Sequence, residues 1–214
     1  MTRVEPRDQD ASQLALAGAL TDLLLADFAL RREGRSVIAV AGESGSGKST
    51  TAIALAEALT NAGLPAHVLH QDDYFVRPPR ANHNFRCRDL ANVGMHEVNL
   101  ALLAEHIAAF RGARHDVTGP RVDYPSDSFH TRPLDFSAAS VLLVEGTYVL
   151  HLDDVDVRIF LEATHEQTAE RRLLRNRDVH APIIDRILAI EHEIIAQQAT
   201  RAQIRIDPAF VIRR

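Results

Sequence analysis

Apolar residues near the start of the chain recur at intervals of three and four, the spacing of one face of a helix. The positions are Leu16, Leu20, Leu23, Leu24 and Phe28. This spacing predicts an amphipathic helix packed on a core, within an N-terminal segment (residues 1–33) whose first ten residues form a solvated end. Asp22 and Asp27 interrupt the apolar run, so it predicts neither a signal peptide nor a membrane span.

Further along the chain, short apolar runs alternate with segments of helical spacing. Residues 36–41, SVIAVA, predict a buried strand, and residues 66–71, AHVLHQ, predict a second one. Between them, residues 48–63 have the spacing of a helix that Gly63 would end. Strand, helix and strand in this order are typical of a parallel sheet.

A polar, proline-bearing region without clear periodicity follows, from residue 76 to residue 96. Helical spacing returns over residues 97–112, again with a glycine at the end. Residues 115–124 predict a small hairpin that turns at Gly119-Pro120. We therefore expect residues 76–135 to form a variable insert.

The second half of the chain returns to alternating strands and helices. Residues 140–146 and 155–163 are apolar and β-branched, which predicts two buried strands. We expect an arginine-rich helix over residues 165–177, a further helix over residues 182–202, and a last strand over residues 208–212.

These elements predict an α/β fold, with a parallel sheet of about five strands and helices on both faces. The chain contains no internal repeat and no low-complexity linker, so we expect one domain over residues 1–214. Its 214 residues are enough for a full hydrophobic core.

Composition narrows the expected partners and the compartment. The formal net charge of -5 gives no indication of a nucleic-acid or membrane-surface partner, whereas homo-oligomer formation is left open. The single cysteine, Cys87, excludes an internal disulfide and suits the reducing cytoplasm, where we expect the protein to be. The 11 histidines form no HExxH motif and accompany no CxxC pair, so the sequence predicts no structural zinc site.

The stretch AVAGESGSGKST, residues 39–50, carries the strongest chemical signal. It fits the phosphate-loop pattern G-x-x-x-x-G-K-[ST], with a strand before it and a helix after it. Backbone N–H groups of such a loop enclose nucleotide phosphates at a helix N-terminus, so the predicted fold is of the P-loop NTPase type. We expect Lys48 to reach the β- and γ-phosphate oxygens of ATP and Ser49 to ligate Mg²⁺. The residues expected to bind the nucleotide are Gly42, Glu43, Ser44, Gly45, Ser46, Gly47, Lys48, Ser49 and Thr50.

A phosphate loop alone does not identify the reaction. The chain contains no LSGGQ-like stretch, as in transporter ATPases, and no NKxD motif for reading guanine. Transfer of a phosphoryl group to a small acceptor is therefore the leading hypothesis. The acceptor would need a second site, and HQDDYFVRP (residues 70–78) lies at the carboxyl end of a predicted strand, where α/β sheets bind ligands.

At this point the sequence resembles the phosphoribulokinase/uridine kinase family of P-loop kinases. The resemblance rests on four segments in the family's order and at similar spacing, from residue 36 to about residue 178: GESGSGKST, QDDYF, VLLVEGTYVL and RRLLRNRD. QDDYF resembles the corresponding motif of nicotinamide riboside kinases more closely than that of uridine kinases.

The resemblance implies roles for single residues. Asp72 would accept the proton of the acceptor hydroxyl and lie near Mg²⁺, with Asp73 as second choice. Tyr74 and Phe75 match aromatic residues that line the acceptor pocket. Glu145, at the end of an apolar strand, would bind the metal or a metal-bound water.

The resemblance also implies that residues 165–178 form a lid over the site, and it suggests which residues contact the acceptor. Arg171 and Arg175 would close over ATP and neutralise charge on the transferred group. Arg172, Arg177 and Tyr124 would contact the acceptor. We thus expect an ATP- and Mg²⁺-dependent kinase of a small alcohol, most simply a nucleoside or a related sugar.

Two alternatives stay open. A basic stretch in the insert could hold an acceptor that carries a phosphate or carboxylate, such as pantothenate or a sugar phosphate. Its arginines are Arg77, Arg80, Arg86 and Arg88. The other alternative is an ATP-binding regulatory protein that has no acceptor.

Overall fold

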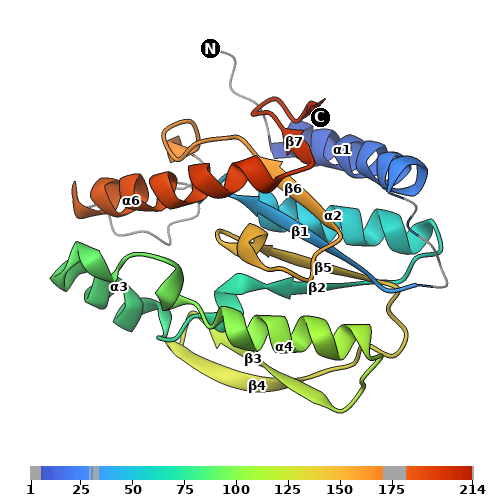
Figure 1. Ribbon diagram of the computed structural model, residues 1–214. Coiled ribbons are helices and arrows are strands. Elements are labelled where there is room, and N and C mark those ends of the chain that lie inside the picture. The colour runs from blue at the N-terminus through green and yellow to red at the C-terminus, as the bar shows by residue number, and fades with distance from the viewer. Residues whose placement is uncertain (1–5, 29, 31–33, 171–181, 214) are drawn as a thin grey trace.

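The computed structural model describes residues 6–28, 30, 34–170 and 182–213. A six-stranded sheet in the order β2-β5-β1-β6-β7-β8 forms its centre, and β3 and β4 form a separate two-stranded sheet (Figure 1). The first five strands of the central sheet run parallel, and β8 joins the edge antiparallel to β7. The expected α/β architecture, with a parallel sheet of about five strands, is confirmed.

The strands of the central sheet lie close to the ranges that the apolar runs predict. They are β1 (Ser36–Gly42), β2 (Ala66–His70), β5 (Val141–Gly146), β6 (Val157–Leu161), β7 (Ile204–Ile206) and β8 (Ile212–Arg213). The predicted strand over residues 208–212 is wrong in its bounds, because Asp207 accepts hydrogen bonds from the backbone of Ala209 and Val211 and holds a turn there. The strand β7, three residues long, precedes that turn and lies between the predicted helix (residues 182–202) and the predicted strand, where no element is expected.

Successive residues of β1 face opposite sides of the sheet, and each side is covered. Val37 and Ala39 belong to one buried cluster, together with Phe110 of α4 (Leu100–Arg111). Ile38 belongs to the other cluster, together with Leu55 of α2 (Lys48–Asn61). Because both faces are buried, β1 and β5 read as continuous apolar runs rather than alternating ones.

The helices are distributed over both faces, as Figure 1 shows. The helix α1 (Pro6–Asp27) packs on α2, and α4 covers the opposite face. The helix α6 (Pro182–Gln198) adds Ile195 to the cluster on the α4 side and continues into a 3-10 turn, Ala199–Arg201. None of the described helices combines the length and apolar character that crossing a membrane requires.

The insert is more ordered than its sequence suggests. Residues 79–88, expected to lack regular structure, form the helix α3 (Pro79–Arg88), which begins at a proline as helices often do. Of its residues only Asn82 is buried, so the helix has no apolar stripe that a periodicity search could detect. Its stability has to come from polar contacts.

The hairpin of the insert turns at a different place from the one predicted. The strands β3 (Val117–Asp123) and β4 (Ser128–Leu134) are joined by residues 124–127, whereas Gly119 and Pro120 lie inside β3. A side chain at position 119 would begin 2.6 Å from Leu134 Cδ1, so the glycine allows close packing here rather than a turn. Proline is tolerated because a two-stranded sheet consists of edge strands.

We expect α1 to be part of the core rather than a dispensable extension, because Leu20 is fully buried against α2. Leu20→Ala should lower the free energy of unfolding by about 2–5 kcal/mol, the range for large-to-small core substitutions. Leu14→Ala on the same helix is the control, since Leu14 is 63% exposed and its loss should change stability by less than about 0.5 kcal/mol. Urea denaturation of both variants tests this, and equal effects would contradict it.

Candidate active site

The phosphate loop connects β1 to α2 in the conformation that anion-binding loops adopt. Gly47 precedes the first turn of α2 with φ of 98°, a left-handed conformation that favours glycine. Lys48 and Ser49 are therefore the first residues of α2, where backbone N–H groups point out of the helix. Both residues line a cavity that also reaches the insert.

Glu145 lies beside this loop because of strand register. On one side β5 pairs with β2, which places Glu145 opposite His70, and on the other β5 pairs with β1. His70 Nδ1 lies 2.7 Å from Glu145 Oε1. Burial raises the pKa of Glu145, but the hydrogen bond to His70 and the charge of Lys48 outweigh burial and hold that pKa below its ordinary value. Glu145 is thus an ionised carboxylate at neutral pH.

The second oxygen of this carboxylate is suited to a cation. Glu145 Oε2 is buried and forms no well-formed hydrogen bond within the part of the chain described. The nearby Ser49 hydroxyl is among the groups that favour the ionised form of Glu145. Hydroxyl and carboxylate oxygens are ligands that Mg²⁺ prefers, so Ser49 and Glu145 fit the metal role expected of them.

Asp72 and Asp73 lie on the short 3-10 helix η1 (Gln71–Tyr74), directly after β2, and point in different directions. Asp72 lines the cavity, and its Oδ2 accepts a hydrogen bond of 3.0 Å from the hydroxyl of Tyr124. Tyr124 comes from the turn of the β3–β4 hairpin and lines the same cavity. The structure thus brings two of the expected acceptor residues into contact.

Asp73 anchors that hairpin instead of entering the cavity. Its side chain is 1% exposed, and Oδ1 accepts a hydrogen bond of 2.9 Å from the backbone N–H of Val122. Arg121 and Arg132 lie 3.5 Å and 3.6 Å from Oδ2. Because both of its carboxylate oxygens contact groups of β3 and β4, Asp73 positions the hairpin and is a poor substitute for Asp72 as a base.

Tyr74 does not lie where the sequence predicts. It is 2% exposed in the core cluster on the α4 side, and its hydroxyl lies 2.7 Å from His106 Nδ1. Burial raises the pKa of Tyr74 far above its ordinary value. On a tight 3-10 turn, neighbouring side chains point in different directions, so Phe75 lines the cavity while Tyr74 packs beneath it.

The cavity that unites these residues has a volume of about 840 Å³. One end is formed by the phosphate loop and the start of α2, and the other by the insert and α6. On the insert side the lining includes polar, aromatic and basic residues: Asp72, Phe75, Arg77, Arg80, Asn82, His83, Asn84, Arg86, Tyr124 and Phe129. A single cavity therefore holds both the expected phosphate-binding and the expected acceptor-binding groups.

A buried ionic group that sequence reasoning did not identify holds α3 in place. Glu97 is 0% exposed and accepts hydrogen bonds from Asn82, the backbone of Gly94 and the guanidinium of Arg86. Arg86 also lies 2.9 Å from Glu191 of α6. These contacts join the two walls of the cavity. No local pattern marks Glu97, because its partners are distant or lie on a helix without apolar periodicity.

The basic stretch of the insert is mostly engaged in internal contacts. Arg86 is neutralised by Glu97 and Glu191, and the Arg77 guanidinium stacks over Phe85 at 3.7 Å from the ring centroid. Arg80 lines the cavity and Arg88 is exposed. Three of the four, Arg77, Arg80 and Arg86, line the same cavity, and the charge of Arg86 is balanced by carboxylates.

Several residues expected at the site lie away from the cavity or outside the described residues. Arg171, Arg172, Arg175 and Arg177 of the lid lie outside the described residues. Thr50 is exposed on α2, and the Glu43 side chain turns away from the cavity toward His165 and His192. Of the remaining loop residues of the expected nucleotide site, Ser44 and Gly45 line the cavity, whereas Gly42, Ser46 and Gly47 are not part of its lining.

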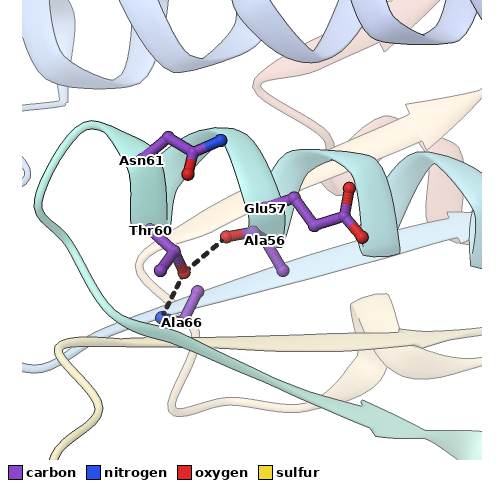
Figure 2. Close-up of a pocket in the computed structure, with 5 residues that line it drawn as sticks. All are labelled: Ala56, Glu57, Thr60, Asn61 and Ala66. Atoms are coloured by element: carbon purple, nitrogen blue, oxygen red, sulfur yellow. Dashed lines mark hydrogen bonds between the residues drawn. The ribbon is translucent and has the colours of Figure 1, made fainter.

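A second, shallow hollow lies elsewhere, between the end of α2 and the start of β2 (Figure 2). Its lining is Ala56, Glu57, Thr60, Asn61 and Ala66. The Thr60 hydroxyl there donates to the carbonyl of Ala56 and accepts from the backbone N–H of Ala66, so it connects the helix to the strand. With one isolated carboxylate and two alanines, this hollow offers no catalytic arrangement.

Comparison with known proteins finds similarity to kinases over most of the chain. The model of the phosphoribulokinase/uridine kinase family matches residues 37–189. A bifunctional alpha-galactosidase/sucrose kinase from Mediterraneibacter gnavus is 34% identical over 184 residues, which are 79% of this chain but only 20% of that protein. A uridine kinase from Leuconostoc citreum (strain KM20) is 29% identical over 170 residues, 72% of this chain and 76% of the relative.

A solved structure shows the same fold. It is a protein from Silicibacter sp. TM1040 that is provisionally assigned as a fructose transport system kinase, with a TM-score of 0.67 and 24% identity. The superposition covers 85% of this chain and 94% of that one.

We expect substitutions in the buried ionic group of Arg86, Glu97 and Glu191 to lower the free energy of unfolding by different amounts. Arg86→Met leaves two buried carboxylates unpaired and should lower the free energy of unfolding by about 3–5 kcal/mol. Glu191→Gln leaves the Arg86–Glu97 pair neutral and should cost less than about 1 kcal/mol at pH 7.

The pH dependence of the second variant follows from burial, which raises the pKa of Glu191 against the opposing charge of Arg86. The folded protein then binds a proton at Glu191 more readily than the unfolded chain does. The contribution of Glu191 to the free energy of unfolding is therefore most favourable below the ordinary pKa of glutamate. It is lost as the pH rises through the raised pKa of Glu191 in the folded protein. Glu191→Gln should gain stability relative to wild type with rising pH, measured by urea denaturation between pH 4 and pH 8. A constant difference would contradict this.

Proposed function

This chain belongs to the phosphoribulokinase/uridine kinase family, and from that membership we propose that it transfers the γ-phosphoryl group of ATP, with Mg²⁺, to a hydroxyl of a neutral sugar. Members of this family are phosphotransferases that act on a hydroxyl of a small molecule. The identity of the acceptor, the roles of the site residues and the use of Mg-ATP are the parts that we propose.

One observation carries the proposal. The carboxylate of Asp72 and the Lys48 and Ser49 side chains line the same cavity, although they come from two different strand ends. A regulatory nucleotide-binding protein would need the phosphate loop but not a carboxylate and aromatic side chains beside it. The shared cavity therefore favours a transferase over the regulatory alternative.

Each residue has a role that its position supports. Asp72 accepts the proton that the acceptor hydroxyl loses as its oxygen takes the phosphoryl group, and Tyr124 holds the Asp72 carboxylate through one oxygen. Lys48 and the loop N–H groups bind the phosphates, while Ser49 and Glu145 would hold the metal. Mg²⁺, when bound, supplies positive charge that neutralises the phosphate oxygens.

The charges around the cavity favour a neutral acceptor. Three arginines line the cavity, and their charge is partly offset, because Arg86 is paired with two carboxylates and Arg77 stacks on Phe85. Amide, imidazole and hydroxyl groups suit the hydroxyls of a sugar, and the rings of Phe75 and Phe129 suit its apolar face. These contacts support a polyhydroxylated acceptor without its own negative charge.

Free sugars and nucleosides both fit that description. The 34% identical relative has sucrose kinase in its name, and this supports a free sugar. A nucleoside is the second candidate, since relatives named uridine kinase are 26–29% identical and aromatic rings can stack on a base.

The role of Asp72 can be tested against its neighbour. Asp72→Asn should lower kcat by about 100- to 10,000-fold, the usual contribution of a general base, and leave ATP binding nearly unchanged. Asp73→Asn is the matched control, because it removes the same charge one residue away and should raise the KM for the acceptor while kcat falls less than about tenfold. Steady-state kinetics with ATP binding by calorimetry separate the two. Full activity of Asp72→Asn would refute the base assignment.

The acceptor can be found by measuring ADP release from Mg-ATP. The panel should contain sucrose and fructose, the nucleosides uridine, cytidine and nicotinamide riboside, and the anions pantothenate and ribulose 5-phosphate. We expect a free sugar to stimulate ADP release by more than about tenfold over water. Stimulation by a nucleoside alone would establish the second candidate, and stimulation by an anion alone would refute the neutral acceptor.

A further inference from the structure

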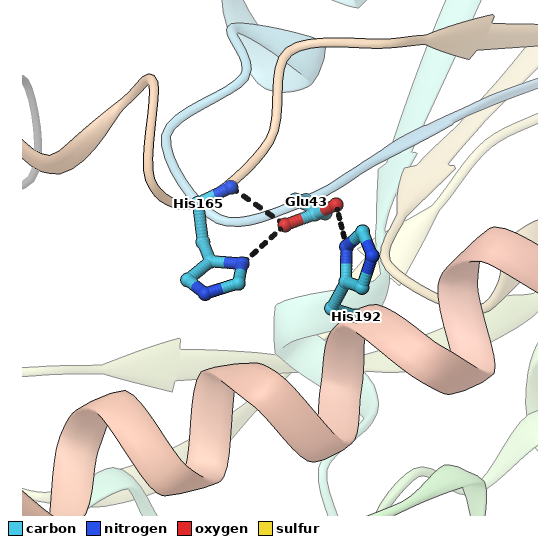
Figure 3. Close-up of side chains that lie close together, drawn as sticks. All are labelled: Glu43, His165 and His192. Atoms are coloured by element: carbon cyan, nitrogen blue, oxygen red, sulfur yellow. Dashed lines mark hydrogen bonds and ion pairs between the residues drawn. The ribbon is translucent and has the colours of Figure 1, made fainter.

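Three side chains outside the cavity converge on one point beside the phosphate loop (Figure 3). Glu43 lies in the loop itself, His165 lies just after β6, and His192 lies on α6. His192 Nδ1 lies 2.7 Å from Glu43 Oε1, and His165 Nδ1 lies 2.9 Å from Glu43 Oε2. One ligand atom of each residue lies within 4.8 Å of the others.

The carboxylate at the centre of this group is buried. The Glu43 side chain is 7% exposed and that of His165 is 16% exposed, whereas that of His192 is 42% exposed. Figure 3 shows both imidazole rings directed at the same carboxylate, one at each oxygen. The group is therefore closed on the side of the loop and accessible beside α6.

We propose that Glu43, His165 and His192 bind a divalent transition-metal cation of the Zn²⁺ class. Two imidazole nitrogens and one carboxylate oxygen form a donor set that zinc sites in proteins use, with a fourth position left for water or another ligand. The exposed side of His192 provides the direction from which the metal and that fourth ligand enter. This site is separate from the Mg²⁺ ligands assigned to Ser49 and Glu145.

The surroundings hold the carboxylate in place for this purpose. The backbone N–H of His165 donates to Glu43 Oε2 at 2.6 Å, which leaves Oε1 to ligate a metal. Such outer hydrogen bonds fix the orientation of a metal-binding carboxylate. To bind the metal through Nδ1, each ring must carry its proton on Nε2, so metal binding replaces the two ring-to-carboxylate hydrogen bonds.

The donor types distinguish this site from a magnesium site. Mg²⁺ prefers oxygen ligands and six-fold coordination, and it has little affinity for imidazole. Millimolar Mg²⁺ should therefore compete poorly for the three residues. A metal here would connect the phosphate loop to α6 by coordination bonds rather than by hydrogen bonds.

The test is titration of the nucleotide-free full-length protein with Zn²⁺ against a chromogenic chelator, in the presence of millimolar Mg²⁺. We expect one equivalent to bind tightly. His192→Gln should weaken this binding by more than about 100-fold, because loss of outer-shell groups alone costs about 10- to 100-fold. Glutamine can still donate a hydrogen bond to Glu43, so this variant removes the metal ligand and keeps the connection to the loop.

Two further measurements complete the experiment. His115→Ala, at an exposed histidine before β3, is the control and should bind Zn²⁺ like wild type. Co²⁺ in place of Zn²⁺ should show the strong visible absorption of a four-coordinate site in wild type and lose it in His192→Gln. Absence of one-equivalent binding, equal binding by His192→Gln, or displacement of Zn²⁺ by Mg²⁺ would each refute the proposal.

Discussion

The parallel register of β2, β5 and β1 is the constraint on which the site depends. It aligns Ala41 with Gly146 and His70 with Glu145, so three strands end at one edge of the sheet. The phosphate loop follows β1, Asp72 follows β2, and Glu145 is the penultimate residue of β5. A shift of β5 by one residue against its neighbours would turn Glu145 to the opposite face and bury a carboxylate without its partners in an apolar cluster. The same register that buries the core thus sets the site.

The insert, which forms the other wall of the cavity, is held in place by buried polar groups rather than by the central sheet. Asp73 fixes the hairpin through the Val122 backbone, and Glu97 fixes α3 through Arg86 and Asn82. Such groups have to be satisfied together, because a buried charge without its partner is costly. Their specific hydrogen bonds give the insert a defined position although it has few apolar contacts. This explains how a polar segment can form one wall of the cavity.

This contrast between the sheet edge and the insert explains which parts of the structure could be predicted from the sequence. The phosphate loop, β1, β2, β5 and the position of Asp72 could be predicted, since they follow from local apolar runs and a strict spacing of glycines, lysine and serine. The helix α3 could not, because its contacts are made by Asn82 and Arg86 with residues more distant in sequence. Gly119 was misread because glycine serves turns and close packing alike. Nor did the aromatic motif reveal that Tyr74 would face His106 rather than the cavity.

Helix α6 contacts both the phosphate loop and the insert. Glu191 and His192 are consecutive residues, about 100° apart around the helix axis, so they point toward different neighbours. Glu191 pairs with Arg86 at the insert wall of the cavity, while His192 contacts Glu43 of the phosphate loop. The backbone carbonyl of Glu43 accepts a hydrogen bond from the backbone N–H of Ser46. A rotation of α6 that strained one of these contacts would also strain the other, because both side chains extend from the same rigid turn. The phosphate loop and the insert wall of the cavity are therefore mechanically connected through this helix.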